Sequence, residues 1–348
     1  AWERPGESAL DEFATAVGTA GDFDGDGRDD VLMGAPRSDF AAFMSTGLKA
    51  TLVTAYQQAA ADATWQQLVQ VEDSDKDLET YPSMGDPEMP RLVNEGQDFE
   101  QLNPGSPDNV KVTNFKYGGL IALTEEAGED DQTPGKALMK QADALGRKHM
   151  ELKDKVFYSL INANPTIYDG GAWFALNHPG YTGGATRSMN DNIYTNVTLS
   201  ANALATIIGI TAQWEGADAD EDLNVRVTDL VVPVTLQQTA LGLTRADLLP
   251  FGYAAGPLGP ATNNGGMPNA MKGKLGVISS QRLDRSSTTD WYWKTNFGGF
   301  IYQRRKGIQV LQEAANAGQA FNADILRWKS KERFGRKVIN WRWGGKVS

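Results

Sequence analysis

The most regular hydrophobic pattern in the chain runs from Thr133 to Pro165. Its apolar positions recur at the spacing that places side chains on one face of a helix, and charged residues such as Lys140, Arg147 and Glu151 occupy the opposite face. Thr133 is placed to cap this helix and Pro165 to end it. We therefore predict one long amphipathic helix that covers a sheet. The positions of its apolar stripe are Leu138, Ala142, Leu145, His149, Leu152 and Val156.

Weaker patterns predict further elements on both sides of this helix. A change of composition near residue 38 marks a boundary, after which Ala41 to Ala63 is expected to be helical. Ser200 is placed to cap a second apolar helix, Ala201 to Trp214. The remaining predictions are a buried strand Val225–Thr235, a short helix Thr244–Leu249, and strands Leu275–Leu283, Trp291–Thr295 and Gly299–Arg304.

An acidic, proline-rich stretch precedes the long helix. Extended segments near residues 68–71 and 110–117 flank it, and its prolines exclude a helix or a central strand. We expect a long two-stranded arm with a polar tip, which cannot bury itself on its own body and so lies on another subunit. A disordered acidic loop is the alternative. The prolines are Pro82, Pro87, Pro90, Pro104 and Pro107.

Charge is unevenly distributed along the chain. The net charge of −11 argues against a general nucleic-acid binder. The arm and the C-terminal stretch nevertheless carry opposite charges, which predicts attraction between them across copies in a symmetric assembly, whereas two solvated faces that never meet are the alternative. The predicted interface residues are Glu72, Asp73, Asp75, Asp77 and Glu79 in the arm, and Arg327, Lys329, Arg333, Arg336 and Lys337 in the tail.

The first segment carries carboxylates at alternating positions of a short loop. This spacing wraps oxygen ligands around a hard cation, so Ca²⁺ is the expected ion, and no other cofactor is required. The loop resembles an FG-GAP repeat of the integrin-type propeller, although Phe13-Ala14 stands where that motif has Phe-Gly, and no second copy follows. A leader without a bound ion is the alternative. The predicted ligands are Asp22, Asp24, Asp26, the Arg28 carbonyl and Asp30.

Nothing in the sequence predicts an enzyme. His178 lies in a segment rich in glycine and aromatic residues, but no Ser or Cys nearby forms a recognisable nucleophile motif, so we predict a packing role. His149 and His178 make no metal-ligand spacing. The chain has no cysteine and no apolar run of membrane-spanning length. Trp and Arg alternate near the C-terminus, which suits a strand with an apolar inner face and a basic outer face better than base stacking.

The order of these elements resembles a known family. An early helix, an acidic hairpin, a very long helix, a mixed domain and a basic terminal strand are similar in order to tailed-phage major capsid proteins of the Hong Kong 97 type. The resemblance covers residues 38 to 348. Its most specific pieces are the hairpin leading into the long helix, the segment YDGGAWFALNHP, which looks like the Mu-like major head subunit family, and the terminal DILRWKSKERFGRKVINWRW.

This resemblance implies an α+β fold of the Hong Kong 97 type. It has an N-terminal arm, an extended β-hairpin loop, a peripheral domain with a long spine helix, and an axial domain. The implied boundaries are an FG-GAP-like leader at 1–37, an N-terminal helix and arm at 38–71, the extended acidic loop at 72–118, the peripheral domain with the spine helix at 119–166, the axial domain at 167–305 and a return to the peripheral domain at 306–348.

The implied function is that of a major capsid protein, which self-assembles into an icosahedral shell around a double-stranded DNA phage genome. The implied location is the virion capsid, assembled in the host cytoplasm. The expected partners are copies of the chain in pentamers and hexamers, a portal, and decoration or scaffolding proteins. Weak, non-specific contact with packaged DNA is also expected, and no membrane. Two alternatives are an encapsulin-type compartment shell and, in a different class, a calcium-dependent adhesion module.

Overall fold

The computed structural model describes residues 17–21, 30–33, 37–83, 92–99, 101, 108–124, 136–176, 178, 190–214, 223–248, 268–313 and 325–348. The chain divides into two units, each described by itself below. The first contains Ala1–Ala59, Gly119–Lys148 and Val310–Ser330, and the second contains Ala60–Gly118, His149–Gln309 and Lys331–Ser348. Across the described ranges, no helix combines the length and the apolar character needed to cross a membrane.

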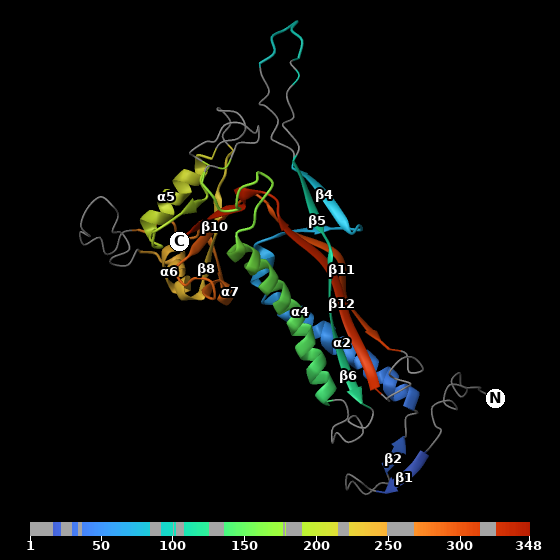
Figure 1. The fold of residues 1–348 in the computed structure, drawn as a ribbon. Coiled ribbons are helices and arrows are strands. Elements are labelled where there is room, and N and C mark those ends of the chain that lie inside the picture. Colours follow the sequence, from blue (N-terminus) through green and yellow to red (C-terminus); the bar gives the residue numbers. More distant parts are fainter. Residues whose placement is uncertain are drawn as a thin grey trace, which may run out of the picture. The chain divides into compact units, whose positions relative to one another are not determined.

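Helices and strands alternate irregularly along the chain (Figure 1). The helices are α2 (Arg37–Ala61), η1 (Thr64–Gln67), α4 (Lys136–Ala163), α5 (Ala201–Ala212), α6 (Val234–Arg245), α7 (Gln281–Asp284) and η2 (Trp341–Trp343). The strands are β1 (Val17–Gly21), β2 (Asp30–Met33), β3 (Gln70–Asp73), β4 (Leu78–Ser83), β5 (Asp108–Thr113), β6 (Phe115–Thr124), β7 (Ile193–Tyr194), β8 (Val227–Pro233), β9 (Gly276–Ser280), β10 (Trp291–Thr295), β11 (Phe300–Gln312), β12 (Ile325–Val338) and β13 (Gly344–Val347).

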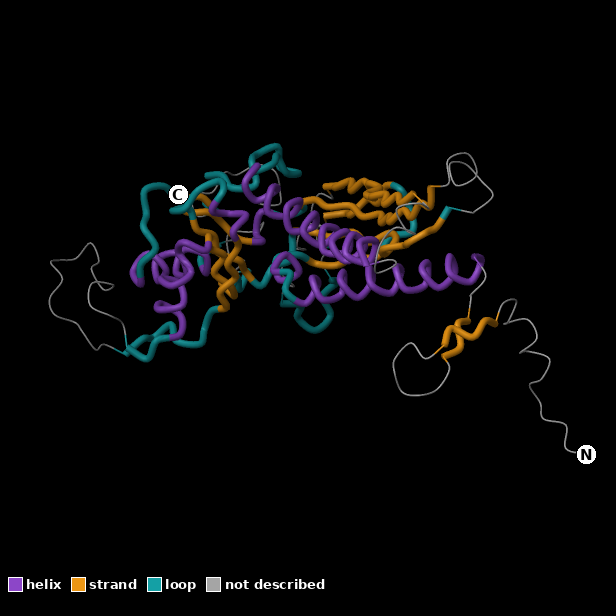
Figure 2. The backbone as a smooth tube through the Cα atoms, turned by 90° about the horizontal axis from the view of Figure 1, so that it is seen from below, coloured by secondary structure: helices purple, strands orange, loops and turns teal. Residues whose placement is uncertain are grey.

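In the first unit, α2 and the N-terminal half of α4 pack side by side (Figure 2). Gly146 permits this approach, because a Cβ atom there would lie 2.4 Å from the Leu52 carbonyl oxygen. Leu52, Ala55 and Ala142 are fully or almost fully buried along the two helices. The predicted helix Ala41–Ala63 is therefore confirmed as α2, with its start moved to Arg37.

The predicted long helix is confirmed as α4. It ends at Ala163, because Asn164 takes a left-handed φ of 46° and the chain turns into Pro165. Ala142, His149 and Val156 of the predicted stripe are buried, whereas Leu145 and Leu152 are half-buried. Lys140, Arg147 and Glu151 face away from the core, as predicted. The predicted capping residue Thr133 lies outside the described residues.

In the second unit, a five-stranded sheet has the order β7-β13-β10-β8-β9. Strand β10 runs antiparallel to β13 and β8, while β8–β9 and β13–β7 are parallel pairs. Leu230, Val231 and Val232 are completely buried, which fits the continuous apolar run of a sheet covered on both faces. The C-terminal strand β13 joins this sheet, so the last residues of the segment 306–348 do not return to the sheet that contains β12.

A second sheet has the order β3-β11-β12-β6. Along β12, Trp328, Ser330, Glu332 and Phe334 are buried, while Lys329 between them is exposed. This alternation confirms the predicted strand with an apolar inner face and a basic outer face. The inner face also contains two polar residues, and one of them, Glu332, is charged.

The predicted arm begins as an antiparallel pair, β4 with β5, whose register runs from Leu78 opposite Thr113 to Ser83 opposite Asp108. The two-stranded root of the arm is therefore confirmed. The chain just before it is not extended throughout, however, because Thr64–Gln67 forms the short helix η1. Trp65 of η1 is buried and stacks on Phe157 of α4 with a ring-centroid distance of 4.8 Å.

The predicted buried strand Val225–Thr235 is confirmed as β8 with shorter bounds, but the helix predicted after it is wrong. The strand ends at Pro233 rather than Thr235, and the next helix is α6 at Val234–Arg245, so the predicted helix Thr244–Leu249 does not exist. Its start is fixed by Asp284 of α7, whose carboxylate accepts hydrogen bonds from the backbone amides of Val234 and Thr235 at 2.8 and 3.1 Å. Likewise β9 stops at Ser280, because the Ser280 hydroxyl caps α7 by accepting from the Arg282 amide.

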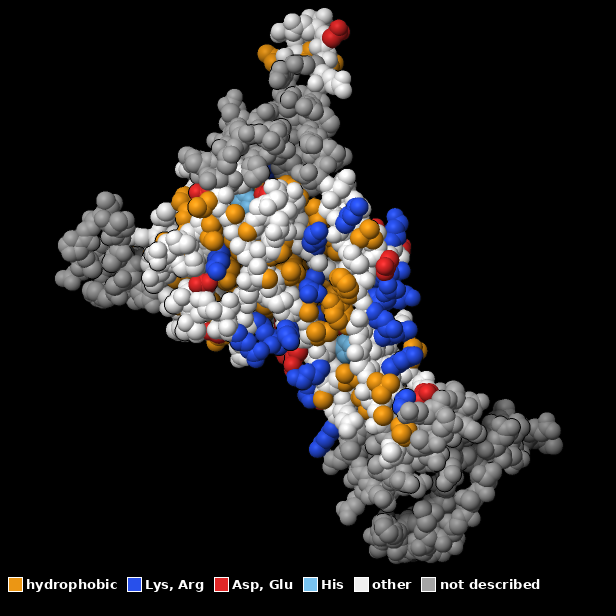
Figure 3. Space-filling model, viewed as in Figure 1, with side chains coloured by type: hydrophobic (Ala, Val, Ile, Leu, Met, Phe, Trp, Pro, Cys, Tyr) orange, Lys and Arg blue, Asp and Glu red, His pale blue; other side chains and the backbone are white. Residues whose placement is uncertain are grey.

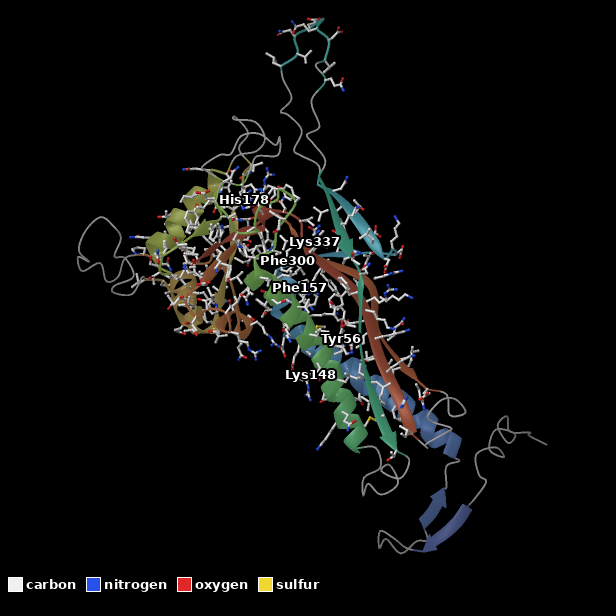
Figure 4. All side chains as sticks on the ribbon, in the orientation of Figure 1. Tyr56, Lys148, Phe157, His178, Phe300 and Lys337 are labelled. Carbon is white, nitrogen blue, oxygen red and sulfur yellow. The ribbon has the colours of Figure 1, made fainter. Side chains whose placement is uncertain are left out.

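The core of the second unit is largely aromatic. Phe157 and Phe300, both labelled in Figure 4, meet edge to face with a centroid distance of 5.3 Å. Phe300 in turn contacts Trp173 at 5.4 Å. The predicted helix after Ser200 is confirmed as α5, and the Ser200 hydroxyl accepts from the Ala203 amide at 3.2 Å.

Candidate assembly surfaces and buried charged clusters

Two aspartates at the base of the acidic arm form ion pairs with arginines of the same chain. The Arg304 guanidinium donates to both oxygens of Asp73, at 2.7 and 3.0 Å, and this hydrogen bonding lowers the pKa of the Asp73 carboxyl. One oxygen of Asp77 accepts from Arg305 and from Arg333, each at 2.7 Å. Two of the predicted interface residues, Asp77 and Arg333, are thus paired within one subunit, and a third, Asp73, pairs with Arg304 of the same subunit. Their predicted contact with a neighbouring copy stays a prediction.

Glu72 and Glu79, two further acidic residues of the predicted interface, contact residues that are close to them in the sequence. Glu72 accepts a hydrogen bond from Gln70 at 2.7 Å, and Glu79 accepts one from the Ser74 hydroxyl at 3.1 Å. Asp75 is exposed in the turn before β4. These residues lie at the root of the arm, where β3 and β4 meet the chain body, and not at its tip.

The basic residues of the predicted interface all lie on β12. Arg327 approaches Glu313 at 3.9 Å, Arg336 donates to the Tyr117 hydroxyl at 2.8 Å, and Lys337 donates to a backbone carbonyl of β5 at 3.2 Å. Lys329 is exposed. The predicted basic tail is therefore strand β12, and several of its charged side chains have partners within the subunit.

A small basic groove lies on the outer face of the second sheet. It has a volume of about 190 Å³, and its lining includes Lys116 of β6, Lys306 of β11, and Lys331 and Arg333 of β12. Figure 3 shows Lys and Arg side chains gathered over this region. Within the described residues the three lysines make no ion pair, and Glu332, which also lines the groove, directs its carboxylate to the opposite face. This arrangement suits an anionic group from outside the chain.

His178, labelled in Figure 4, is completely buried, as a packing role predicts. It also has an orienting partner that the sequence did not reveal. Its Nδ1 atom lies 2.8 Å from Asp169 Oδ2, and its Nε2 atom lies 3.1 Å from Asn192 Oδ1. The ring stacks on Trp341 at 4.8 Å with an interplanar angle of 2°. Both ring nitrogens are engaged and the ring is buried, so this pair is structural and not catalytic.

A second buried cluster surrounds Glu332. One carboxylate oxygen lies 3.0 Å from His149 Nδ1, and the other lies 2.9 Å from Lys153 Nζ. All three side chains are at most 4% exposed. The Lys153 ammonium also lies 5.3 Å and 5.5 Å from the ring centres of Tyr302 and Phe334. Sequence reasoning missed this cluster, although the spacing of His149 and Lys153, one helical turn apart, is a local signal.

The N-terminal Asp-rich loop lies largely outside the described residues, which exclude Asp22, Asp24, Asp26 and Arg28. Its two ends are described: β1 and β2 pair antiparallel, with Gly21 opposite Asp30. In the described ranges, no group of three or more His, Cys, Asp or Glu side chains is arranged to hold a metal ion.

The model of the phage capsid protein family matches residues 109–347, and the chain therefore belongs to the phage capsid protein family. This is a structural family and not an enzyme family. A second model, for the FG-GAP repeat, matches residues 13–50. A search of curated proteins found no match.

Solved capsids share the fold. The capsid structure of the cyanophage P-SCSP1u matches with a TM-score of 0.50 and 10% identity, covering 80% of this chain and 86% of that one. The capsid of bacteriophage JBD30 matches with a TM-score of 0.43 and 14% identity, covering 81% of this chain and 64% of that one. The predicted α+β fold of the Hong Kong 97 type is confirmed.

The predicted function is confirmed at the level of the family: the chain is a phage capsid protein, and its location is the virion capsid. The match to phage capsids favours a viral shell over an encapsulin-type compartment. The alternative function, a calcium-dependent adhesion module, is supported by the single FG-GAP match to residues 13–50. The domain boundaries predicted from the resemblance stay a prediction.

Proposed function

We propose that copies of this chain close into pentamers and hexamers of a shell by laying the acidic arm of one copy on the basic groove of a neighbour. The groove carries this proposal, because it gathers lysines that have no ion-pair partner among the described residues. The pairing of Asp77 with Arg305 and Arg333 supports it, since it is an example of a carboxylate bound on the same sheet. Heterologous contacts of this kind close into rings.

The described tip of the arm adds an apolar component. Residues 92–99 contain a tight turn, in which the Gln97 amide donates to the Asn94 carbonyl at 3.0 Å and Gly96 takes a φ of 85°. Leu92 and Phe99 flank this turn and are 89% and 88% exposed. Two large apolar side chains at one loop tip are typical anchors for a hydrophobic site on a partner.

Substitution of the tip tests the apolar component. We expect Leu92→Ser with Phe99→Ser to abolish closed particles in negative-stain microscopy and to reduce light scattering during assembly. Leu176→Ser is the matched control, because Leu176 is an exposed apolar residue away from the arm. Uniform hollow particles from the double variant would remove the tip from the proposal.

Charge reversal tests the groove. Lys116→Glu with Lys331→Glu should block assembly, whereas Lys274→Glu, at an exposed site outside the groove, should not. Glu95→Lys with Asp98→Lys in the arm of the same chain should restore it, if the arm is the groove's ligand. Assembly should also loosen near 1 M salt, where charges are screened over about 3 Å. Assembly unaffected by both changes would rule out the charge pairing.

The genome and the accessory proteins belong to the same proposal. The chain carries a net charge of −11, so we expect the wall to contact a packaged double-stranded DNA genome weakly and without sequence choice. A portal and decoration or scaffolding proteins complete the proposed particle. The YDGGAWFALNHP segment supports placing the chain among Mu-like major head subunits.

We also propose that the leader binds Ca²⁺ through Asp22, Asp24, Asp26, the Arg28 carbonyl and Asp30. The donor set consists of hard oxygen ligands at alternating positions, and the pairing of Gly21 with Asp30 holds the two ends of the loop together. Titration calorimetry of the full chain should detect binding that Asp24→Asn with Asp26→Asn abolishes. Equal heats for both chains would refute a calcium site here.

A further inference from the structure

The acidic arm leaves the second sheet through two short connections, near β11 and β12 (Figure 1). Residues 74–77 join β3 to β4, and Asn114 is the single residue between β5 and β6. The Asn114 backbone amide donates to the Asp77 carbonyl at 2.9 Å, and its side chain donates to the Lys76 carbonyl at 2.8 Å. The base of the arm is therefore closed by hydrogen bonds between the segment that enters it and the segment that leaves it.

The Ser74 hydroxyl connects this base to the sheet. It is buried, and its oxygen accepts hydrogen bonds from Asn114 Nδ2 at 3.1 Å and from Gln303 Nε2 at 3.0 Å. Its own proton is then left for the Glu79 carboxylate at 3.1 Å or the Lys76 carbonyl at 3.2 Å. Gln303 is completely buried and belongs to β11, an inner strand of the sheet. One hydroxyl thus joins both connections of the arm to that strand.

A second hydrogen bond to Gln303 comes from the arm itself. The Tyr81 hydroxyl on β4 donates to Gln303 Oε1 at 3.1 Å, so Ser74 and Tyr81 hold the two ends of the Gln303 amide. Burial raises the pKa of Tyr81, and Glu72 and Glu79 raise it further, so the hydroxyl keeps the proton that it donates. Turning the arm away would leave the buried amide unpaired, which costs more than the hydrogen bonds themselves contribute.

Close backbone packing also limits the arm. Gly335 of β12 lies against the end of β5, where a Cβ atom would be 2.7 Å from the Thr113 carbonyl oxygen and 3.0 Å from the buried Val112 side chain. Even the smallest side chain at position 335 therefore requires the backbone to move. On β11, the neighbouring strand, a Cβ atom at Gly307 would have nothing within 4 Å.

We infer that these contacts form a rigid joint, in which Gln303 and Gly335 are positioning residues that set the direction of the arm before a neighbour binds. The inference rests on the proposed function, in which the arm docks on the groove of a second copy. An arm that is already oriented loses less conformational entropy on docking, which favours binding. The residues of this arm joint are Ser74, Tyr81, Asn114, Gln303 and Gly335.

The direction of the arm also decides what its contacts build. Heterologous contacts close into a ring only when the rotation from one copy to the next closes, and otherwise they continue as an open assembly. The exposed ion pairs of Asp77 with Arg305 and Arg333 contribute too little to fix that rotation. A loosened arm joint should therefore give open and irregular assemblies in place of uniform closed particles.

Distance measurements on the unassembled full-length subunit test the arm joint without a neighbour. The chain has no cysteine, so Asn109→Cys on β5 and Thr288→Cys, both at exposed sites of the second unit, provide one spin-label pair. Pulsed electron paramagnetic resonance should give one narrow distance distribution. Gly335→Ala should broaden or shift it, and Gly307→Ala, the same substitution in open space, should not. A broad distribution with the joint intact would overturn the inference.

Tyr81→Phe tests the same joint with a milder change, in case the alanine variant does not fold. It removes one hydroxyl from a half-buried side chain. We expect hydrogen exchange at the Ser74 and Asn114 backbone amides to become about fivefold faster, the factor that corresponds to about 1 kcal/mol for one lost hydrogen bond. Tyr194→Phe, which removes a tyrosine hydroxyl elsewhere in the second unit, is the control. Exchange that Tyr81→Phe leaves unchanged would rule out the joint.

Negative-stain microscopy separates the arm joint from the docking site. We expect open or irregular assemblies from Gly335→Ala and uniform closed particles from Gly307→Ala. Uniform particles from a Gly335→Ala subunit that folds and has a broadened distance distribution would refute the positioning role. A narrow distribution with the joint intact, together with assembly that survives charge reversal of the groove, would refute the docking site and leave the joint standing.

Discussion

The two histidines of this chain occupy similar surroundings with different charge balance. Both are buried, and each places Nδ1 beside a carboxylate, His149 at 3.0 Å from Glu332 and His178 at 2.8 Å from Asp169. Glu332 has a second partner, since Lys153 lies 2.9 Å from its other oxygen. The Asp169 carboxylate instead accepts from a neutral backbone amide.

This difference predicts unequal contributions to stability. In the first cluster the Lys153 ammonium balances the charge of Glu332. Among the described residues, the Asp169 carboxylate pairs with no lysine or arginine, and His178 is its side-chain partner.

The largest effect is expected at Glu332. Glu332→Gln removes the carboxylate that pairs with the buried Lys153 ammonium, and the loss of one partner of a buried pair costs about 4 kcal/mol. Urea unfolding of the subunit at pH 7 measures this loss. Glu151→Gln, on the exposed face of the same helix, is the control.

The double variant Glu332→Leu with Lys153→Met sharpens this prediction. It removes both charges and keeps apolar volume, so it should be much more stable than Glu332→Gln. A single variant that loses less than about 1 kcal/mol would show that water or another group already screens Lys153.

The same substitution in both histidines compares the clusters directly. His178→Leu leaves the Asp169 carboxylate buried without its side-chain hydrogen-bond partner, and we expect a loss of about 3 kcal/mol. His149→Leu leaves Glu332 paired with Lys153, and we expect about 1 kcal/mol for the missing hydrogen bond. Urea unfolding at pH 7 measures both. Equal losses would contradict the difference in charge balance.

The sequence predicted the helix that carries His149, but not the contacts that His149 and Lys153 make with Glu332. Helical periodicity placed His149 on the buried stripe of α4, and that position is buried. Lys153 was assigned neither to the apolar face nor to the polar face of the predicted helix. A lysine is buried only where a partner compensates its charge, and the sequence did not reveal that partner. That partner, Glu332, lies on β12 far along the chain, and its pairing depends on how the sheet packs on the helix.

The same dependence on residues far along the chain explains why the helix after β8 was predicted at the wrong position. The apolar pattern predicted a strand there, but its end only approximately. Helix α6 begins at Val234 because a carboxylate from α7 caps it, and residue 284 gives no local sign of this role. The arm, by contrast, was predictable, since proline content, charge and flanking extended segments are local properties.

Asp284 provides a half-buried carboxylate for comparison with the two buried ones. Partial burial acts to raise its pKa, but hydrogen bonds from Thr235 and Val234 outweigh burial and lower the pKa below the usual value. Its stabilising effect is present above the unfolded-state pKa of about 3.9 and is lost as the pH falls through the lowered value. Asp284→Ala should cost about 1 kcal/mol at pH 7, as for a lost helix cap, and less at pH 2.

Thermal unfolding at the two pH values checks this prediction, and Asp247→Ala, whose carboxylate pairs with an exposed lysine, is the control. A loss that is the same at pH 2 and pH 7 would mean that the charge of Asp284 does not contribute to the cap.

The smallest effect is expected at the root of the arm. Asp77 pairs with Arg305 and Arg333 at 2.7 Å, as short as the buried pairs, but its side chain is 68% exposed. Exposed pairs contribute less than about 1 kcal/mol, so Asp77→Ala should cost about 0.5 kcal/mol in urea unfolding. The loss should vanish in 1 M salt, where screening acts over about 3 Å. Asp75→Ala, in the same turn and also exposed, should cost nothing. A salt-resistant loss above 2 kcal/mol at Asp77 would show that distance, and not burial and charge balance, determines the strength of these pairs.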